Sequence, residues 1–166
     1  STQGPVTIYI YPGEYEEIFP LEIPTNVTVA GLDMRNTIIK PTSATNTNNC
    51  FLVNGETTVQ NITIKDFYSP GHAFSFASNT TVTTRSPYIK NVTVITKGSV
   101  VSASDPRGFD QGDAGKGALV DGANVTSTSE EASMLFHSVT FINPGVDALT
   151  MTNGVRVEWL TTFTYF

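Results

Sequence analysis

Residues 105–122, DPRGFDQGDAGKGALVDG, combine four aspartates with five glycines and place Arg107 and Lys116 between them. Loops of this composition bind metal ions, hold phosphate groups on main-chain N–H groups, or present catalytic carboxylates. A phosphate-binding P-loop needs Gly-x4-Gly-Lys-Ser/Thr before a helix. Here Gly117 takes the position of the hydroxyl residue and Asp110 that of the first glycine. The P-loop interpretation is therefore excluded.

Calcium binding is the second chemistry that this loop could support. An EF-hand places oxygen ligands at alternating positions and ends with a glutamate at the twelfth. Asp105, Asp110 and Asp113 are instead five and three residues apart. A loop can still gather oxygens around a cation without a linear motif, so cation binding stays open. The preferred interpretation is a corner insertion in which Gly and Asp supply turns, more plausible as a contact surface than as a reaction site.

Carboxylates elsewhere in the chain are the candidates for acid–base catalysis. Polysaccharide hydrolases and lyases use such groups in pairs on a solvent-facing strand array. No pair of acids recurs at matching positions of neighbouring strand motifs, as an acidic groove would require. The tight cluster Glu14, Glu16 and Glu17 follows a Pro-Gly corner and is expected to keep an exposed turn soluble. The other acids lie in predicted loops or are isolated: Asp33, Asp66, Asp147 and Glu158.

Histidine, cysteine and serine side chains give no stronger site. His72, His137 and Cys50 are too few and too scattered for a zinc site. His72 follows Pro-Gly and is predicted at a turn, whereas His137 is predicted to point outward from its strand. Ser138 has no visible acid partner for a triad. The sequence therefore predicts no catalytic, cofactor-binding or metal-ligating residue, and no cofactor.

Composition indicates an all-β protein of one domain. The chain has 166 residues, of which 39% are hydrophobic and 14% charged. Val and Ile outnumber Leu, and β-branched residues pack better on a pleated sheet than in a helix. The net charge of −6 argues against nucleic-acid binding, which depends on Lys and Arg neutralising phosphates. No apolar run approaches the length of a membrane-spanning helix, so no membrane partner is expected.

A short strand pattern returns along the chain as VQNITI (59–64), IKNVTV (89–94) and FHSVTF (136–141). Its apolar residues alternate with polar ones, which is typical of a strand with one buried face. Asn61 and Asn91 are predicted at matching bends, because Asn tolerates a left-handed backbone. An antiparallel sandwich is the alternative, but motifs separated by unequal insertions favour a β-solenoid. We expect one β-helix segment over 1–166 with a loop-rich insertion over 97–131.

Aromatic residues gather near the two ends of the sequence and suggest packing against further coils or a neighbouring subunit. The chain is accordingly expected to be a segment of a longer polypeptide. Asn-x-Thr sequons also recur, but three of the five coincide with the strand pattern, so glycosylation is not expected. The aromatic residues are Tyr9, Tyr11, Tyr15, Phe19, Trp159, Tyr165 and Phe166, and the sequons begin at Asn26, Asn61, Asn79, Asn91 and Asn124.

Two stretches resemble known protein groups. The opening VTIYIYPGEYEEIFPLEIPTNVTVAG resembles the first coil of right-handed parallel β-helix, pectin-lyase-like proteins, which often carry PG-x-Y-x-E followed by an apolar-Thr-apolar strand ending in Gly. Residues 104–166 resemble a segment of large virion structural proteins from contractile-tailed phages of marine cyanobacteria. That likeness rests on the Gly-Asp loop and on the words EASMLF, VTF, NGVRVEWL and FTYF.

The phage resemblance implies a non-enzymatic structural role in the virion, as a tail, fibre or particle-surface component. Its implied partners are other virion proteins and copies of the same chain, with a trimer favoured. A host surface glycan is a possible further ligand. Two alternatives stay open: a tailspike-type polysaccharide depolymerase and a bacterial surface adhesin on the same scaffold.

Overall fold

A computed structural model describes residues 4–76, 86–96, 98, 111–123, 134–142 and 147–165, which form two sheets and one 3-10 turn, η1 (Gln111–Asp113). The first sheet contains β1 (Val6–Ile10), β4 (Val27–Gly31), β7 (Thr58–Lys65), β9 (Tyr88–Ile95), β11 (Met134–Ile142) and β13 (Val157–Leu160), joined by β2 (Gly13–Glu17), β5 (Thr37–Pro41) and β14 (Phe163–Tyr165). The second sheet contains β3 (Leu21–Ile23), β6 (Phe51–Val53), β8 (His72–Phe76), β10 (Lys116–Asp121) and β12 (Leu149–Thr152).

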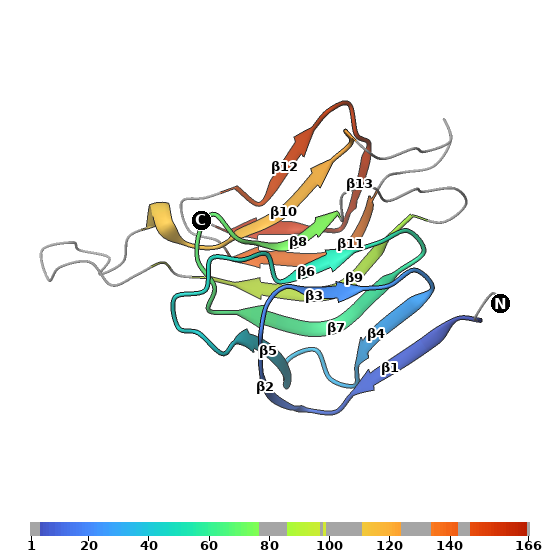
Figure 1. The fold of residues 1–166 in the computed structure, drawn as a ribbon, viewed down its shortest axis with the longest axis horizontal. Helices are drawn as coiled ribbons and strands as arrows, with labels where there is room; N and C mark the ends of the chain where they lie inside the picture. Colours follow the sequence, from blue (N-terminus) through green and yellow to red (C-terminus); the bar gives the residue numbers. More distant parts are fainter. Residues whose placement is uncertain are drawn as a thin grey trace, which may run out of the picture.

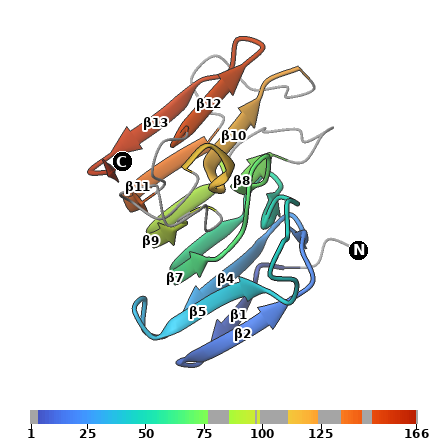
Figure 2. The ribbon, with the colours of Figure 1, turned by 90° about the vertical axis from the view of Figure 1, so that its left-hand side faces the viewer.

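Every pairing between two of these strands is parallel. The chain passes from the first sheet to the second and back, so strands that are neighbours in a sheet come from successive passes (Figures 1 and 2). Parallel neighbours require crossover connections, whereas a hairpin sandwich would pair consecutive strands antiparallel. No two consecutive strands pair within the described ranges, so the sandwich alternative does not fit.

The repeated strand pattern lies in register across β7, β9 and β11. Val59 pairs with Ile89, Ile89 pairs with Phe136, and Phe136 pairs with Trp159. Val59, Ile89 and Phe136 are all fully buried. The predicted alternation, with apolar side chains inward, is therefore confirmed, and fully burying each such side chain stabilises the fold by roughly 1.5–3 kcal/mol.

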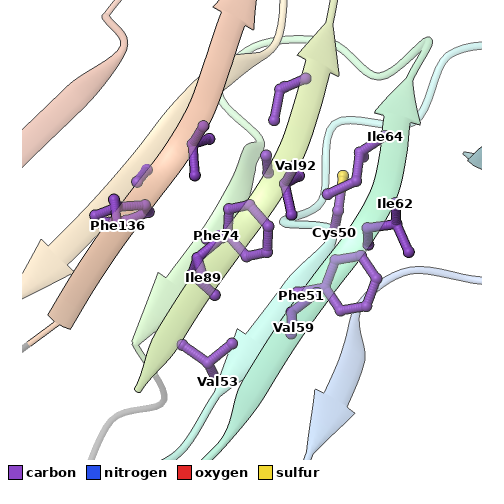
Figure 3. Packing of buried hydrophobic residues seen from close by; sticks show 14 of the residues in the cluster. Cys50, Phe51, Val53, Val59, Ile62, Ile64, Phe74, Ile89, Val92 and Phe136 are labelled. Carbon is purple, nitrogen blue, oxygen red and sulfur yellow. The ribbon is translucent and has the colours of Figure 1, made fainter. Parts of the chain in front are cut away.

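Aromatic rings connect the two sheets through the core. Phe51 stacks on Phe74 with ring centroids 5.8 Å apart, and both come from the second sheet. Phe74 meets the edge of Phe136 from the first sheet at 6.4 Å. Figure 3 shows Phe51, Phe74 and Phe136 among the aliphatic side chains that fill the space between the sheets.

The first sheet bends at one matching position in successive strands. Asn61 and Asn91 have φ values of 57° and 50°, and Asn91 Nδ2 donates a hydrogen bond to Asn61 Oδ1 at 3.2 Å. The predicted left-handed bends are therefore confirmed. Ser138 and Thr161 continue the bend with φ values of 57° and 45°. Gly31, the last residue of β4, lies against the bend of β7. A Cβ atom there would come within 2.0 Å of the Asn61 carbonyl oxygen, so only glycine fits.

Replacing Asn91 with alanine is expected to lower the free energy of unfolding by about 1–2 kcal/mol, because alanine resists the left-handed backbone and loses the bond to Asn61. Asn91→Gly is the matched control, since it restores the backbone freedom without the side chain and should lose less. Urea denaturation of the two variants measures the difference. Equal losses would contradict a backbone cause and would assign the loss to the side-chain hydrogen bond.

The structure places one core strand inside the expected loop-rich insertion over 97–131. Lys116–Asp121 form β10, which pairs with β8 on one side and β12 on the other. Ala118 and Val120 are fully buried within it. Residues 97, 99–110 and 124–133 lie outside the described residues. The apolar run ALV thus contributes a core strand to a stretch whose Gly and Asp content indicates a loop.

Candidate functional site

Four charged side chains form a cluster on the outer face of β2, β5 and β7. Lys40 contacts Glu14 and lies 3.1 Å from Glu16, and Lys65 Nζ lies 3.5 Å from the second Glu14 oxygen. The Lys40 hydrogen bond holds the pKa of Glu14 below its usual value, and the same bond raises the pKa of Lys40. We call Glu14, Glu16, Lys40 and Lys65 the charged cluster. Its acids and cations balance.

The sequence predicts an exposed turn for the glutamates of the charged cluster, but the structure places them in strand β2. A general acid must hold a proton near the working pH, whereas Lys40 and Lys65 favour the ionised form of Glu14. Beside the cluster is a shallow hollow of about 290 Å³ that Asp66, Thr42 and Tyr68 also line. Glu16 and Asp66 are the two carboxylates that line this hollow. The ion-paired charged cluster and the hollow together suit a polar contact surface better than a site of proton transfer.

The Gly-Asp stretch 105–122 is described from residue 111 onward. Asp121 Oδ1 accepts hydrogen bonds from Asn153 Nδ2 at 2.6 Å and from the Ala123 main-chain N at 3.0 Å. The Asn153 bond is the main cause of the lowered pKa of Asp121. Lys116 Nζ lies 3.4 Å from Asp147. These contacts fix corners of neighbouring passes, which gives the described part of the stretch a structural role.

No group of three or more His, Cys, Asp or Glu side chains that could hold a metal ion occurs among the described residues. Asp105, Arg107 and Asp110 lie outside those residues.

Asp33 caps a tight turn between β4 and β5. Its Oδ1 accepts hydrogen bonds from the main-chain N of Arg35 at 2.9 Å and of Asn36 at 3.2 Å, and its Oδ2 accepts from Asn36 Nδ2 at 2.8 Å. The Asn36 side-chain bond is the main cause of the lowered pKa of Asp33. This carboxylate therefore shapes a loop, which is a common use of aspartate at turns.

The sequence predicts His72 at a turn, but in the structure it is buried and is the first residue of β8. Asn49 Oδ1 accepts a hydrogen bond from the His72 main-chain N at 2.9 Å and lies 3.3 Å from His72 Nδ1. Burial lowers the pKa of His72 to about 4, with a smaller contribution from Lys116, while Asp147 opposes the shift. A neutral imidazole therefore closes this corner of the core.

The chain is expected to lose stability as the pH falls from about 6.5 towards about 4, because His72 takes up a proton in the unfolded chain before it does so in the folded one. Above the unfolded-state pKa, both states are neutral and this loss is absent. Urea midpoints at about pH 7 and about pH 5 measure it, since the carboxylates with lowered pKa values titrate mostly at lower pH. His72→Gln should flatten the slope in this window; an unchanged slope would contradict the assignment to His72.

His137 forms a pair with Tyr88 on the outer face of the first sheet. The Tyr88 hydroxyl lies 2.9 Å from His137 Nδ1, and the two rings are nearly parallel with centroids 6.4 Å apart. Ser138 is at the bend, where its Oγ lies 3.3 Å from Thr161 Oγ1, so it has the wrong partner for a triad. The sequence alone does not predict this pair, because it depends on the register that sets Tyr88 against Leu135.

Cys50 is fully buried, and this burial raises the pKa of its thiol well above the usual value. A thiolate is the nucleophilic and metal-binding form of cysteine. The environment of Cys50 therefore favours a packing role, in agreement with its position in the core cluster beside Phe51 (Figure 3).

A hollow of about 530 Å³ lies at the β1–β3 end of the two sheets. Its walls are mainly apolar and include Ile8, Tyr15 and Leu21 together with the core residue Phe51. Phe19, expected among the aromatics at the ends, is buried instead. The hollow is the open end of the space between the sheets. Within the described residues, β1, β2 and β3 each pair with a strand on one side only.

The chain matches no protein-family model, no curated protein and no solved structure. Within the described ranges, no helix is both long enough and apolar enough to span a membrane.

Proposed function

We propose that this chain is a non-enzymatic structural segment of a phage virion protein, built as a right-handed parallel β-helix. It would stand in a tail, a fibre or the particle surface, in contact with other virion proteins and with copies of itself, a trimer being the favoured assembly. Host surface glycan is a possible further ligand. The observation that carries the proposal is the in-register parallel stacking of successive passes.

Parallel stacking supports a mechanical role. In β9 the main chain bonds to β7 on one side and to β11 on the other, so the strand cannot open without breaking both ladders. The inward side chains of each pass rest on those of the next, as Val59, Ile89 and Phe136 do. Stability in such an array is approximately a sum over passes and their interfaces, which suits an elongated, load-bearing particle component.

The ends of the stack support contact with further coils. The β1–β3 end exposes the apolar hollow, and large side chains such as Ile8 and Tyr9 are more than half exposed there. Exposed strand edges with apolar side chains favour edge-to-edge pairing. Coils of the same kind, from flanking sequence or from a partner chain, would cover both features.

The carboxylates support a role without catalysis. Glu14 is bound to lysines, Asp33 caps a turn and Asp121 holds a corner. Each therefore has a structural partner that lowers its pKa, whereas a catalytic acid is usually shifted upward by burial or by a like charge.

Two assays test the proposal on the full-length protein. Quantitative mass spectrometry of purified phage particles should find the chain in a fixed copy number. Incubation with host envelope polysaccharide should release no oligosaccharide. Released oligosaccharides would favour the tailspike-type depolymerase instead, and a genomic neighbourhood without capsid and tail genes would favour the adhesin.

A further inference from the structure

An apolar patch lies on the outer face of the first sheet, away from the core. It consists of Ile95, Ile142, Phe163 and Tyr165. Phe163 and Tyr165 are each 58% exposed and Ile95 is 38% exposed. Tyr165 pairs with Ile142, and Ile142 pairs with Ile95, so the patch runs across three strands.

The patch faces outward and not along the stack. Val94 and Phe141 are fully buried, and successive side chains of a strand point to opposite faces, so Ile95 and Ile142 leave the sheet on its outer side. A further pass of chain stacked beyond β14 would pair with the edge of that strand and leave its outer face open. An occupant must therefore approach from the side.

Two rows of outward side chains cross the first sheet, with the apolar patch at one end and the charged cluster at the other. One row runs from Glu14 through Ile38, Thr63, Thr93 and Thr140 to Phe163. The parallel row carries Glu16 and Lys40, then Lys65, Ile95, Ile142 and Tyr165. The two rows thus carry the apolar patch over β9, β11 and β14, threonines between, and the charged cluster over β2, β5 and β7. Thr63 is buried in the first row, where its Oγ1 donates a hydrogen bond to the Met34 carbonyl at 2.8 Å.

We propose that this face binds a second copy of the chain, placed side by side and pointing in the same direction. In that arrangement apolar patch meets apolar patch, and the charged cluster meets its own equivalent. A copy in the opposite direction over the same rows would set Lys40 against Ile142 and Lys65 against Ile95, which would desolvate charges without partners.

Charge favours this part of the surface as the place where two copies can meet. The chain carries a net charge of −6, so copies repel one another over most of their surface. The charged cluster contributes two carboxylates and two lysines, and the rest of the two rows is uncharged. The two rows together therefore carry no net charge. Rotation about an axis parallel to the stack would close such contacts into a ring.

This inference deepens the proposed function. The trimer as the favoured ring rests on the proposed function, whereas the side-by-side contact is argued from the residues of this face alone.

Sedimentation equilibrium of the chain should reveal a closed oligomer. Phe163→Glu together with Tyr165→Glu should raise the dissociation constant by about a hundredfold or more. Ile18→Glu is the matched control, because Ile18 is 82% exposed outside the patch, and it should leave the assembly unchanged. A monomeric parent chain, or equal effects of patch and control variants, overturns the inference.

Cysteine cross-linking tests the direction and does not depend on weakened folding. Thr140→Cys lies in the row between patch and cluster, and Glu16→Cys lies at the charged end. Copies that point the same way should give disulfide-linked dimers from each single variant on oxidation, with the parent chain and its buried Cys50 as the control. Dimers from Thr140→Cys alone would overturn the common direction. A monomeric chain that is nevertheless stoichiometric in the particle would refute this inference and leave the proposed function standing.

Discussion

Phe136→Ala is expected to lower the free energy of unfolding by about 3–5 kcal/mol, as for a large aromatic side chain removed from a packed core. Phe136 is 0% exposed and lies where the two sheets meet. Its ring is 6.4 Å from Phe74 of the second sheet and 5.0 Å from Trp159 of the next pass. Neighbours from three strands surround Phe136, so a shift of one neighbour cannot fill the cavity that the alanine would leave.

Urea denaturation followed by the fluorescence of Trp159 and by far-ultraviolet circular dichroism measures the loss. Trp159 also lies 5.3 Å from Phe141, so its emission reports the same region of the core. Ile18→Ala, at a side chain 82% exposed, is the control and should change stability by no more than about 0.5 kcal/mol. A loss at Phe136 of less than about 1 kcal/mol would mean that the site repacks and that the stacked aromatic core is not a main source of stability.

The sequence predicts the first sheet well because each strand there contains the information for its own placement. The alternation of 59–64, 89–94 and 136–141 marks which side chains are buried, and the Asn at the third position marks the bend. In 136–141 the third position is Ser138, which has the same left-handed backbone. Both signals are local. Parallel, in-register pairing then follows from matching equal patterns, since a shift by one residue would turn every apolar side chain outward.

The second sheet is harder to predict because its strands are short and their partners are distant in sequence. β10 begins where the Lys116 N donates to the Gly71 carbonyl, and Gly117 N donates to that of Asp147. Neither contact leaves a mark in the local sequence, so the glycines and aspartates around β10 indicate a loop. His72 is misplaced for the same reason: its Pro-Gly predecessor signals a turn, but β10 makes the next residue a strand.

The candidate surfaces depend on register even more strongly. Ile95, Ile142 and Tyr165 are 23 or more residues apart in sequence and become neighbours only through β9, β11 and β14. The charged cluster likewise joins β2, β5 and β7. A sequence pattern identifies which positions of one strand point outward, but the composition of a face emerges only when the strands are aligned.

Gly117→Ala is expected to destabilise the chain by about 3 kcal/mol, at the upper end of the usual cost of overpacking. A Cβ atom at Gly117 would lie 2.0 Å from the Ala148 carbonyl oxygen and 2.7 Å from its carbon. That oxygen accepts the hydrogen bond from the Ala118 N at 2.9 Å, so it cannot move without breaking the ladder between β10 and β12. The added methyl group must therefore separate two paired strands.

Gly4→Ala is the matched control for this substitution, because no heavy atom lies within 4 Å of a Cβ built at Gly4. It makes the same chemical change and should leave the stability within about 0.5 kcal/mol of the parent chain, as measured by urea denaturation. A large difference between the two variants would assign the glycine of the GKG sequence to close main-chain contact between passes. Equal stabilities of the two variants would contradict that contact. They would favour a loop at residues 105–122, as the composition of this stretch suggests.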